Sequence, residues 1–257
     1  INFHLQIDKM NLIEWQKNFA AVNTEKTKNQ KTDQDLGELI PDWPIEGTLK
    51  IGQLNYQNLE VTDFETNVTS KNDLIQLGKL NFQTAQGRVT GLGKLNLQGQ
   101  QPRYDGDLKI AKMEVNSVLS SLTKFDDKLY GGLDLDLNFA GTGLKLEQIL
   151  SSLTLNGDVL IDNTKLSAKQ IIKQLNSYFA VVDDSELNLG KLKGKIKLKD
   201  GKLMVNKVKT ISQGAQITLN GYSTLTGNLN FKIDYLLSPE KSQQLKLEHK
   251  ELLYAPN

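Results

Sequence analysis

The sequence contains no cysteine, only two histidines and no long hydrophobic run. The absence of cysteine excludes disulfides, thiolate metal sites and cysteine nucleophiles. His4 and His249 lie at opposite ends of the chain, so a catalytic triad or a histidine-based zinc site lacks the converging groups that it needs. No apolar stretch approaches the roughly 20 residues of a membrane-spanning helix. We therefore predict a protein that is not an enzyme and that uses no metal or cofactor.

An excess of charge of one sign is also lacking. The chain has 31 Lys and Arg against 30 Asp and Glu, a formal net charge of +1. Nucleic-acid-binding proteins usually carry a basic excess, because neutralisation of phosphates supplies most of their affinity. We therefore expect no nucleic-acid partner. The chain begins at Ile1 within a strand-like stretch, so we expect any targeting or membrane-anchoring segment to lie outside it.

Alternation of apolar and polar residues dominates the sequence, and it has the period of a half-buried β-strand. The clearest example runs from Leu133 to Phe139, with leucine or phenylalanine at every second position. Strands at such short spacing indicate an antiparallel meander. Four residue pairs with turn chemistry predict the turns between strands: Asn156-Gly157, Asp200-Gly201, Asn220-Gly221 and Gly227-Asn228.

A few segments have helical spacing instead. Apolar residues fall on one helical face in residues 9–22, 145–152 and 167–179, and 116–122 predicts a further turn or two. Residues 23–36 carry almost no large apolar side chain, which predicts a mobile loop. We predict one β-sheet domain over residues 1–238, followed by a charged tail over residues 239–257.

The candidate chemical motifs are weak. Asp134-x-Asp136 has the form of a metal-binding or glycosidase-like pair, but both aspartates are expected on the polar face of a strand whose other face is leucine. A glycan-active enzyme would depend on this pair. Gly91-Leu92-Gly93 lacks the third glycine and the βαβ setting of a dinucleotide loop. Glycines within strands are expected to mark bulges or bends.

Five lysines occupy alternate positions from Lys191 to Lys199, with apolar residues between most of them. Such a row of ammonium groups can attract anionic lipid headgroups. It also keeps a long strand soluble and deters edge pairing. We favour the structural interpretation, with acidic neighbours such as Asp134 and Asp136 offsetting the charge across the sheet.

The apolar faces of the strands need a covering layer. The predicted helices are few and short against a dozen or more strands. Either the sheet folds on itself as a sandwich, or it curves around something that is not protein. An exposed apolar surface beyond a few hundred Å² would mark a binding site or an aggregation hazard.

Three groups of motifs share their order and spacing with a known family. Tyr130-Gly131-Gly132 opens a strand, a short helix around Leu146 to Leu150 follows, and Leu155-Asn156-Gly157-Asp158-Val159 begins the next strand. The closing strands run from Asp200-Gly201-Lys202-Leu203 through Gly214 and Gly221, and Gly47-Thr48-Leu49-Lys50-Ile51 opens an earlier unit. In this order the motifs resemble the AsmA family, over roughly Ile1 to Leu237. The chain departs from the family where Gln83-Thr84-Ala85-Gln86-Gly87 replaces a first Tyr-Gly-Gly.

The resemblance implies an extended, curved antiparallel sheet that forms an open trough with an apolar interior, mainly β, with a few short helices as caps. It also implies a Gram-negative envelope protein in the periplasm, anchored to the inner membrane by a segment absent from this chain. Family members are linked to outer-membrane biogenesis and to phospholipid movement between the two membranes.

The leading hypothesis is therefore a non-enzymatic module that holds or conducts phospholipid or another acyl-chain lipid along a groove. Alternation predicts the groove-lining residues: Leu133, Leu135, Leu137, Val159, Ile161, Ile217, Leu219, Phe231 and Ile233. The helices at 9–22 and 167–179 would cap or plug parts of the groove. The alternative is a chaperone-like or structural module that assists outer-membrane protein assembly by pairing with client strands.

Overall fold

The computed structural model describes residues 1–14, 43–56, 59–99, 101–122, 128–143, 146–167, 172–173, 186–212, 215–224 and 228–239. Strands make up most of this part of the chain. The strands are β1 (Asn2–Asn11), β2 (Ile45–Tyr56), β3 (Leu59–Lys71), β4 (Leu74–Thr84), β5 (Gly87–Asn96), β6 (Arg103–Glu114), β7 (Leu129–Thr142), β8 (Thr154–Leu166), β9 (Leu187–Lys199), β10 (Lys202–Ser212), β11 (Ala215–Thr224) and β12 (Leu229–Leu237). The helices with defined bounds are α2 (Val115–Leu122) and α3 (Leu146–Ser152).

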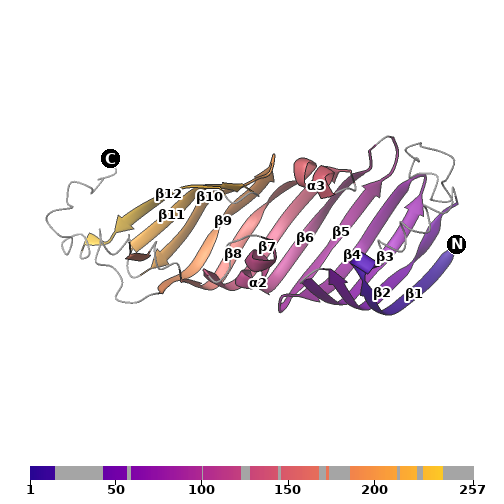
Figure 1. Ribbon diagram of the computed structural model, residues 1–257, viewed down its shortest axis with the longest axis horizontal. Coiled ribbons are helices and arrows are strands. Elements are labelled where there is room, and N and C mark those ends of the chain that lie inside the picture. The colour runs from indigo at the N-terminus through magenta and orange to yellow at the C-terminus, as the bar shows by residue number, and fades with distance from the viewer. Residues whose placement is uncertain are drawn as a thin grey trace. The chain divides into compact units, whose positions relative to one another are not determined.

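The strands form one 12-stranded sheet in which spatial order follows chain order, from β1 to β12 (Figure 1). The sheet is open, since within the described residues β1 and β12 each pair on one side only. The predicted fold class, mainly β with one open sheet and few short helices, is confirmed. No helix in the described ranges is both long and apolar enough to cross a bilayer.

The chain divides into two compact units, which are described separately. Unit 1 comprises Ile1–Met113, Leu135–Gly157 and Leu198–Gly201. Unit 2 comprises Glu114–Asp134, Asp158–Lys197 and Lys202–Asn257.

In unit 1 the pairs from β2 to β6 are antiparallel, as predicted, but β1 pairs with β2 in parallel. Phe3, Leu5 and Ile7 face Gly47, Leu49 and Ile51 in this register. The connection between these strands, residues 12–44, is far longer than a hairpin turn. Two parallel strands need a crossover connection of a dozen or more residues, so a connection of this length permits β1 and β2 to pair in parallel.

Register in unit 1 places apolar residues of successive strands on the same side. Ile45 of β2 pairs with Ser70 of β3, Ser70 with Ile75 of β4, Ile75 with Leu95 of β5, and Leu95 with Tyr104 of β6. Because paired residues point to the same side of a sheet, these rows define the apolar face of unit 1. The opposite face carries charge, for example the Lys50 Nζ–Glu65 Oε1 ion pair of 2.9 Å.

In unit 2 the pairs β10–β11 and β11–β12 are antiparallel. Val208 of β10 pairs with Leu219 of β11, which pairs with Ile233 of β12. Thr210, Ile217 and Tyr235 form the neighbouring row. These rows belong to the apolar face of unit 2, which also carries the core cluster of Ile172, Leu187 and Leu189 with the packed residues Leu166, Leu192 and Ile217.

Register shifts interrupt several strand pairs. They coincide with positive φ values at Asp63, Lys79 and Lys207. The sequence prediction that glycines mark the bulges is therefore wrong at these three positions. Side-chain hydrogen bonds hold two of these sites. Gln83 Nε2 donates to Asp63 Oδ2 (2.8 Å), and the Lys207 N–H donates to Asn220 Oδ1 (2.8 Å). These bonds help to offset the cost of the left-handed conformation for a non-glycine residue.

Of the four predicted turns, one is confirmed and two are wrong, while Gly227-Asn228 lies partly outside the described residues. Asp200 and Gly201 form the turn between β9 and β10, both with positive φ. Asn156-Gly157 and Asn220-Gly221 instead lie within β8 and β11. A Cβ on Gly221 would lie 2.1 Å from the carbonyl oxygen of Asn230 in β12. The glycine is therefore explained by close approach of the neighbouring backbone, and sequence chemistry alone does not separate that need from a turn.

The helix predictions hold at α2 and α3, which match the segments 116–122 and 145–152 closely. The helix predicted from residue 9 begins no earlier than Leu12, because β1 extends to Asn11. Of the segment 167–179, only Ser167, which is not helical, and the helical pair Ile172–Lys173 are described. The predicted loop at 23–36 and the tail beyond Pro239 lie outside the described residues.

Candidate functional site

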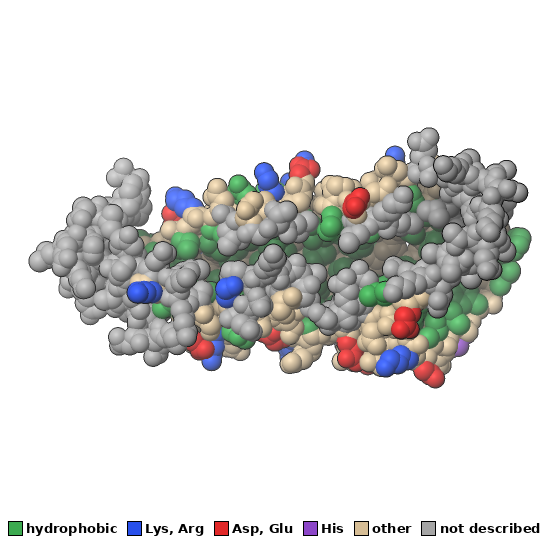
Figure 2. Space-filling view, viewed as in Figure 1, with side chains coloured by type: hydrophobic (Ala, Val, Ile, Leu, Met, Phe, Trp, Pro, Cys, Tyr) green, Lys and Arg blue, Asp and Glu red, His purple; other side chains and the backbone are tan. Residues whose placement is uncertain are grey.

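The predicted groove residues share their alternation but differ in accessibility. In unit 1, Leu137 is buried and Leu135 is half-buried. In unit 2, Leu133, Val159 and Ile161 are buried, Ile217 and Leu219 are half-buried, and Phe231 and Ile233 are exposed. Figure 2 shows hydrophobic side chains gathered on the viewed face, whereas charged side chains lie mainly along its margins.

Asp136 of β7 lies on the charged face of unit 1. Lys109 Nζ of β6 forms an ion pair with Asp136 Oδ2 at 3.4 Å, and Asn138 donates a hydrogen bond to Asp107. Alternation then directs Leu137 and Phe139 to the apolar face of unit 1. Among the described residues, no three His, Cys, Asp or Glu side chains form a group able to hold a metal ion.

The lysine row of β9 is partly paired across the sheet. Lys191 Nζ lies 3.1 Å from Asp162 Oδ1, and Lys195 Nζ lies 3.6 Å from Asp158 Oδ1. Carboxylates therefore offset the row as the structural interpretation predicts. Of the two expected partners, Asp136 is wrong. The partners are aspartates of β8, and Asp136 pairs with Lys109 instead.

Aromatic rings cover part of the apolar face of unit 1. The Phe64 and Phe82 ring centroids are 6.0 Å apart, and those of Tyr104 and Phe139 are 6.5 Å apart. The Phe139 ring lies where a side chain at Gly106 would stand, since a Cβ there would be 2.7 Å from Phe139 Cζ. Alternation within single strands does not identify these ring pairs, because they form between strands.

Every buried polar side chain among the described residues is a serine or a threonine. Most of their hydroxyls donate to backbone carbonyl oxygens. Thr66 Oγ1 donates to the Gly78 carbonyl (3.1 Å), Thr84 Oγ1 to Glu60 (2.7 Å) and Thr164 Oγ1 to Ile161 (3.0 Å), while Thr210 and Ser212 donate to Leu189 and Asn188. The exception is Ser70, whose Oγ has no partner among the described residues. The buried Tyr104 Oη and Asn81 Oδ1 atoms have none there either.

These hydrogen bonds have a chemical consequence for the face. A hydroxyl that donates to its own sheet no longer needs water or another polar partner. Thr66 and Thr164 are fully buried, so the sheet contains these polar residues without exposing their hydroxyls at its surface. The arrangement therefore suits contact with hydrocarbon.

In unit 2 the chain itself covers part of the apolar face. Ile172 is only 3% exposed and packs on Leu187 and Leu189. Farther along the same face, Phe231 and Ile233 of β12 are 38% and 48% exposed. Between these extremes, burial raises the pKa of the Tyr235 phenol above its ordinary value, so this group is neutral at physiological pH.

Comparison with known proteins identifies the family. Neither the curated proteins nor the solved structures include a match to the chain. The sequence model of the AsmA family matches residues 3–208. This match spans most of the chain and includes β2 to β9 in full, and the chain therefore belongs to the AsmA family.

Proposed function

We propose that this chain is a non-enzymatic envelope-biogenesis module that holds or conducts phospholipid, or another acyl-chain lipid, on the apolar faces of its sheet. It acts in the periplasm between the inner and outer membranes, with an inner-membrane anchor supplied by a segment outside this chain. Membership of the AsmA family and the open β-sheet are consistent with this role.

The observation that carries the proposal is an apolar face whose buried threonine hydroxyls donate to backbone carbonyl oxygens. A lipid chain on such a face meets methyl groups and rings, and it leaves few polar groups without a partner. Burial of each methylene contributes about 0.8 kcal/mol. Passive partition therefore suffices for binding, and no nucleophile, metal or cofactor takes part.

The direct test is lipid extraction. The delipidated chain is incubated with phospholipid vesicles, re-isolated and analysed for bound lipid by mass spectrometry. We expect bound phospholipid with the wild-type chain. The absence of any extracted lipid would contradict the proposal.

A matched pair of variants locates the binding face. Ile233→Lys places a charge on the apolar face of unit 2, whereas Ile211→Lys places it on the opposite face of the same unit. Both isoleucines are exposed, so neither change removes a core contact. We expect Ile233→Lys to reduce extracted lipid several-fold and Ile211→Lys to leave it unchanged.

The open edge of β12 favours a second candidate, a chaperone-like or structural module for outer-membrane protein assembly. Within the described residues β12 pairs only with β11, and its nine residues leave main-chain groups along the other side. An extended client segment would add to such an edge by β-augmentation. A proline in β12 that preserves the fold but abolishes binding of an unfolded outer-membrane protein would support this candidate.

A further inference from the structure

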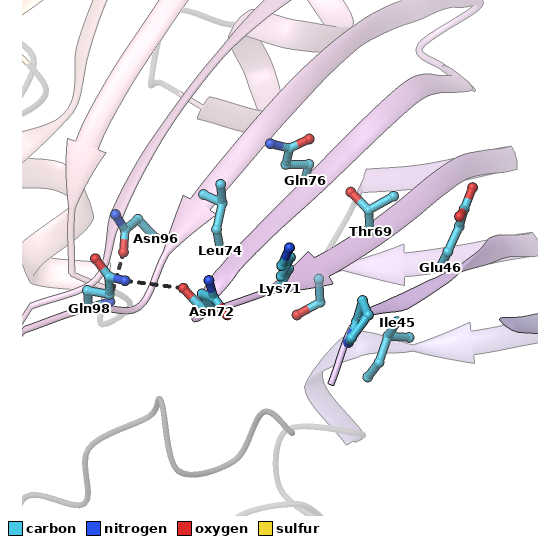
Figure 3. A pocket seen from close by; sticks show the side chains of 11 residues that line it. Ile45, Glu46, Thr69, Lys71, Asn72, Leu74, Gln76, Asn96 and Gln98 are labelled. Atoms are coloured by element: carbon cyan, nitrogen blue, oxygen red, sulfur yellow. Dashed lines mark hydrogen bonds between the residues drawn. The ribbon is translucent and has the colours of Figure 1, made fainter. Parts of the chain in front are cut away.

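A cavity of about 620 Å³ lies in unit 1 where β2 and β4 begin and β3 and β5 end. Figure 3 shows side chains from all four strands around it. Polar and apolar groups both line it, from Pro44, Ile45, Glu46, Thr69, Ser70, Lys71, Asn72, Leu74, Gln76, Asn96 and Gln98. A volume of this size falls within the usual range for small-molecule sites.

The cavity lies where the two faces of the sheet meet. Ile45 and Ser70 belong to the row that continues through Ile75 and Leu95 on the apolar face. Glu46, Thr69 and Gln76 are paired with one another in the adjacent row and therefore point to the other face. A ligand in the cavity thus has an apolar path on one side and polar groups on the other.

One carboxylate and one ammonium group line this cavity. Within the described residues neither Glu46 nor Lys71 belongs to an ion pair, in contrast to Lys50 and Glu65 farther along the same strands. The amides nearby are held in place: Gln98 Nε2 donates to the Asn72 carbonyl (3.2 Å), and the Gln98 N–H donates to Asn96 Oδ1 (2.8 Å) (Figure 3).

Ser70 adds an unused donor at the same place. Its side chain is 6% exposed, and its Oγ has no hydrogen-bond partner in the described part of the chain. A buried hydroxyl is normally paired, so a hydroxyl at a cavity wall without a partner among the described residues is available to donate to a ligand acceptor. An ester or phosphate oxygen of a ligand has the required chemistry.

From these features we propose that the cavity binds the headgroup of a zwitterionic glycerophospholipid whose acyl chains lie on the apolar face of unit 1. The ligand ammonium group pairs with Glu46, the phosphate pairs with Lys71, and an ester or phosphate oxygen accepts the Ser70 hydroxyl. The inference rests on the proposed function and specifies the lipid class: phosphatidylethanolamine satisfies both charges, whereas phosphatidylglycerol leaves Glu46 unpaired.

The strand next to the cavity is long enough for the chains. From Ser70 to Phe64 the apolar-face residues of β3 extend about 20 Å along the sheet. One leaflet of a bilayer has a hydrocarbon thickness of about 15 Å. An acyl chain that starts at the cavity therefore ends near the Phe64–Phe82 ring pair.

The test is competition between two lipids. The delipidated chain is incubated with vesicles containing equal amounts of dioleoyl phosphatidylethanolamine and dioleoyl phosphatidylglycerol, and bound lipid is quantified by mass spectrometry. Glu46→Lys is compared with Glu65→Lys, which makes the same charge change in the same unit, about 13 Å farther along β3. Circular dichroism verifies that both variants fold.

We expect the wild-type chain to enrich phosphatidylethanolamine, Glu46→Lys to lower the ratio about threefold, and Glu65→Lys to leave it near the wild-type value. Equal ratios in all three proteins, with lipid bound, would overturn the headgroup site and leave the proposed function intact. If no lipid of either kind is bound, the proposed function fails and the headgroup site fails with it.

Discussion

Two strips on the apolar face of unit 2 have similar sequences and opposite environments. The covered strip consists of Leu187 and Leu189 in β9, which lie under Ile172 and are 3% and 9% exposed. The open strip consists of Phe231 and Ile233 in β12, which are 38% and 48% exposed. Both strips alternate with polar residues, so alternation reports which face a residue is on and not whether that face is covered.

The difference separates two roles of the same apolar face. In the covered strip, leucines and Ile172 form a core whose burial stabilises the fold. In the open strip, apolar side chains remain available to a ligand or to an added strand. The proposed function predicts that stability depends on the covered strip and lipid binding on the open strip.

The largest expected effect is the loss of a core leucine. Leu187→Ala should lower the free energy of unfolding by about 3 kcal/mol, because it removes buried methyl groups and leaves a cavity. Ile233→Ala, in the open strip of β12, should cost less than about 1 kcal/mol. Urea unfolding followed by circular dichroism measures both, and equal costs would remove the distinction between the strips.

Shortening the covering residue should have the next largest effect. Ile172→Ala is expected to cost about 2 kcal/mol, since the side chain is buried against Leu187 and Leu189. It should also expose these leucines and increase the fluorescence of an apolar dye in the presence of the folded protein. A stable variant without increased dye binding would indicate that Ile172 does not cover the strip.

In the open strip the pattern should reverse. Phe231→Ser and Ile233→Ser should change the free energy of unfolding by less than about 1 kcal/mol each, because both side chains are substantially exposed. Lipid extracted from vesicles should nevertheless fall several-fold. Mass spectrometry of a variant that carries both substitutions is the measurement. An unchanged amount of extracted lipid would show that the open strip does not contact lipid.

The smallest effect is expected on the charged face of unit 2. The Lys195–Asp158 pair is largely exposed, so Asp158→Asn should cost less than about 0.5 kcal/mol and should be masked by salt. Lipid extraction should be unaffected. A reduction comparable to that of the open-strip variants would indicate that the lysine row attracts anionic headgroups after all.

Local patterns predicted the β class and the apolar side of several strands because period 2 is a property of a single strand. Leu137, Val159 and Ile161 are on that side and buried, as a strand with one core-facing side requires. The same reasoning predicted bounds for α2 and α3 that are close to the observed ones, since helical spacing is equally local.

The remaining features depend on contacts between distant segments. Burial of Leu187 depends on Ile172, and the ion pair of Lys195 depends on the register between β8 and β9. The bulge at Lys207 is held by Asn220 of the next strand, and Gly221 is required by the backbone of β12. None of these partners is visible within the strand that they affect, so period and turn chemistry could not predict them.

Photo-crosslinking at two adjacent residues of β12 tests the central claim most directly. Ile233 lies on the apolar face of unit 2, and Lys232 lies on the opposite face in an ion pair with Asp234 (3.0 Å). A benzophenone amino acid is introduced at each position, and the chain is irradiated with phospholipid vesicles. The proposed function predicts a lipid adduct at position 233 and none at position 232, whereas equal adducts at both positions, or none at either, would contradict it.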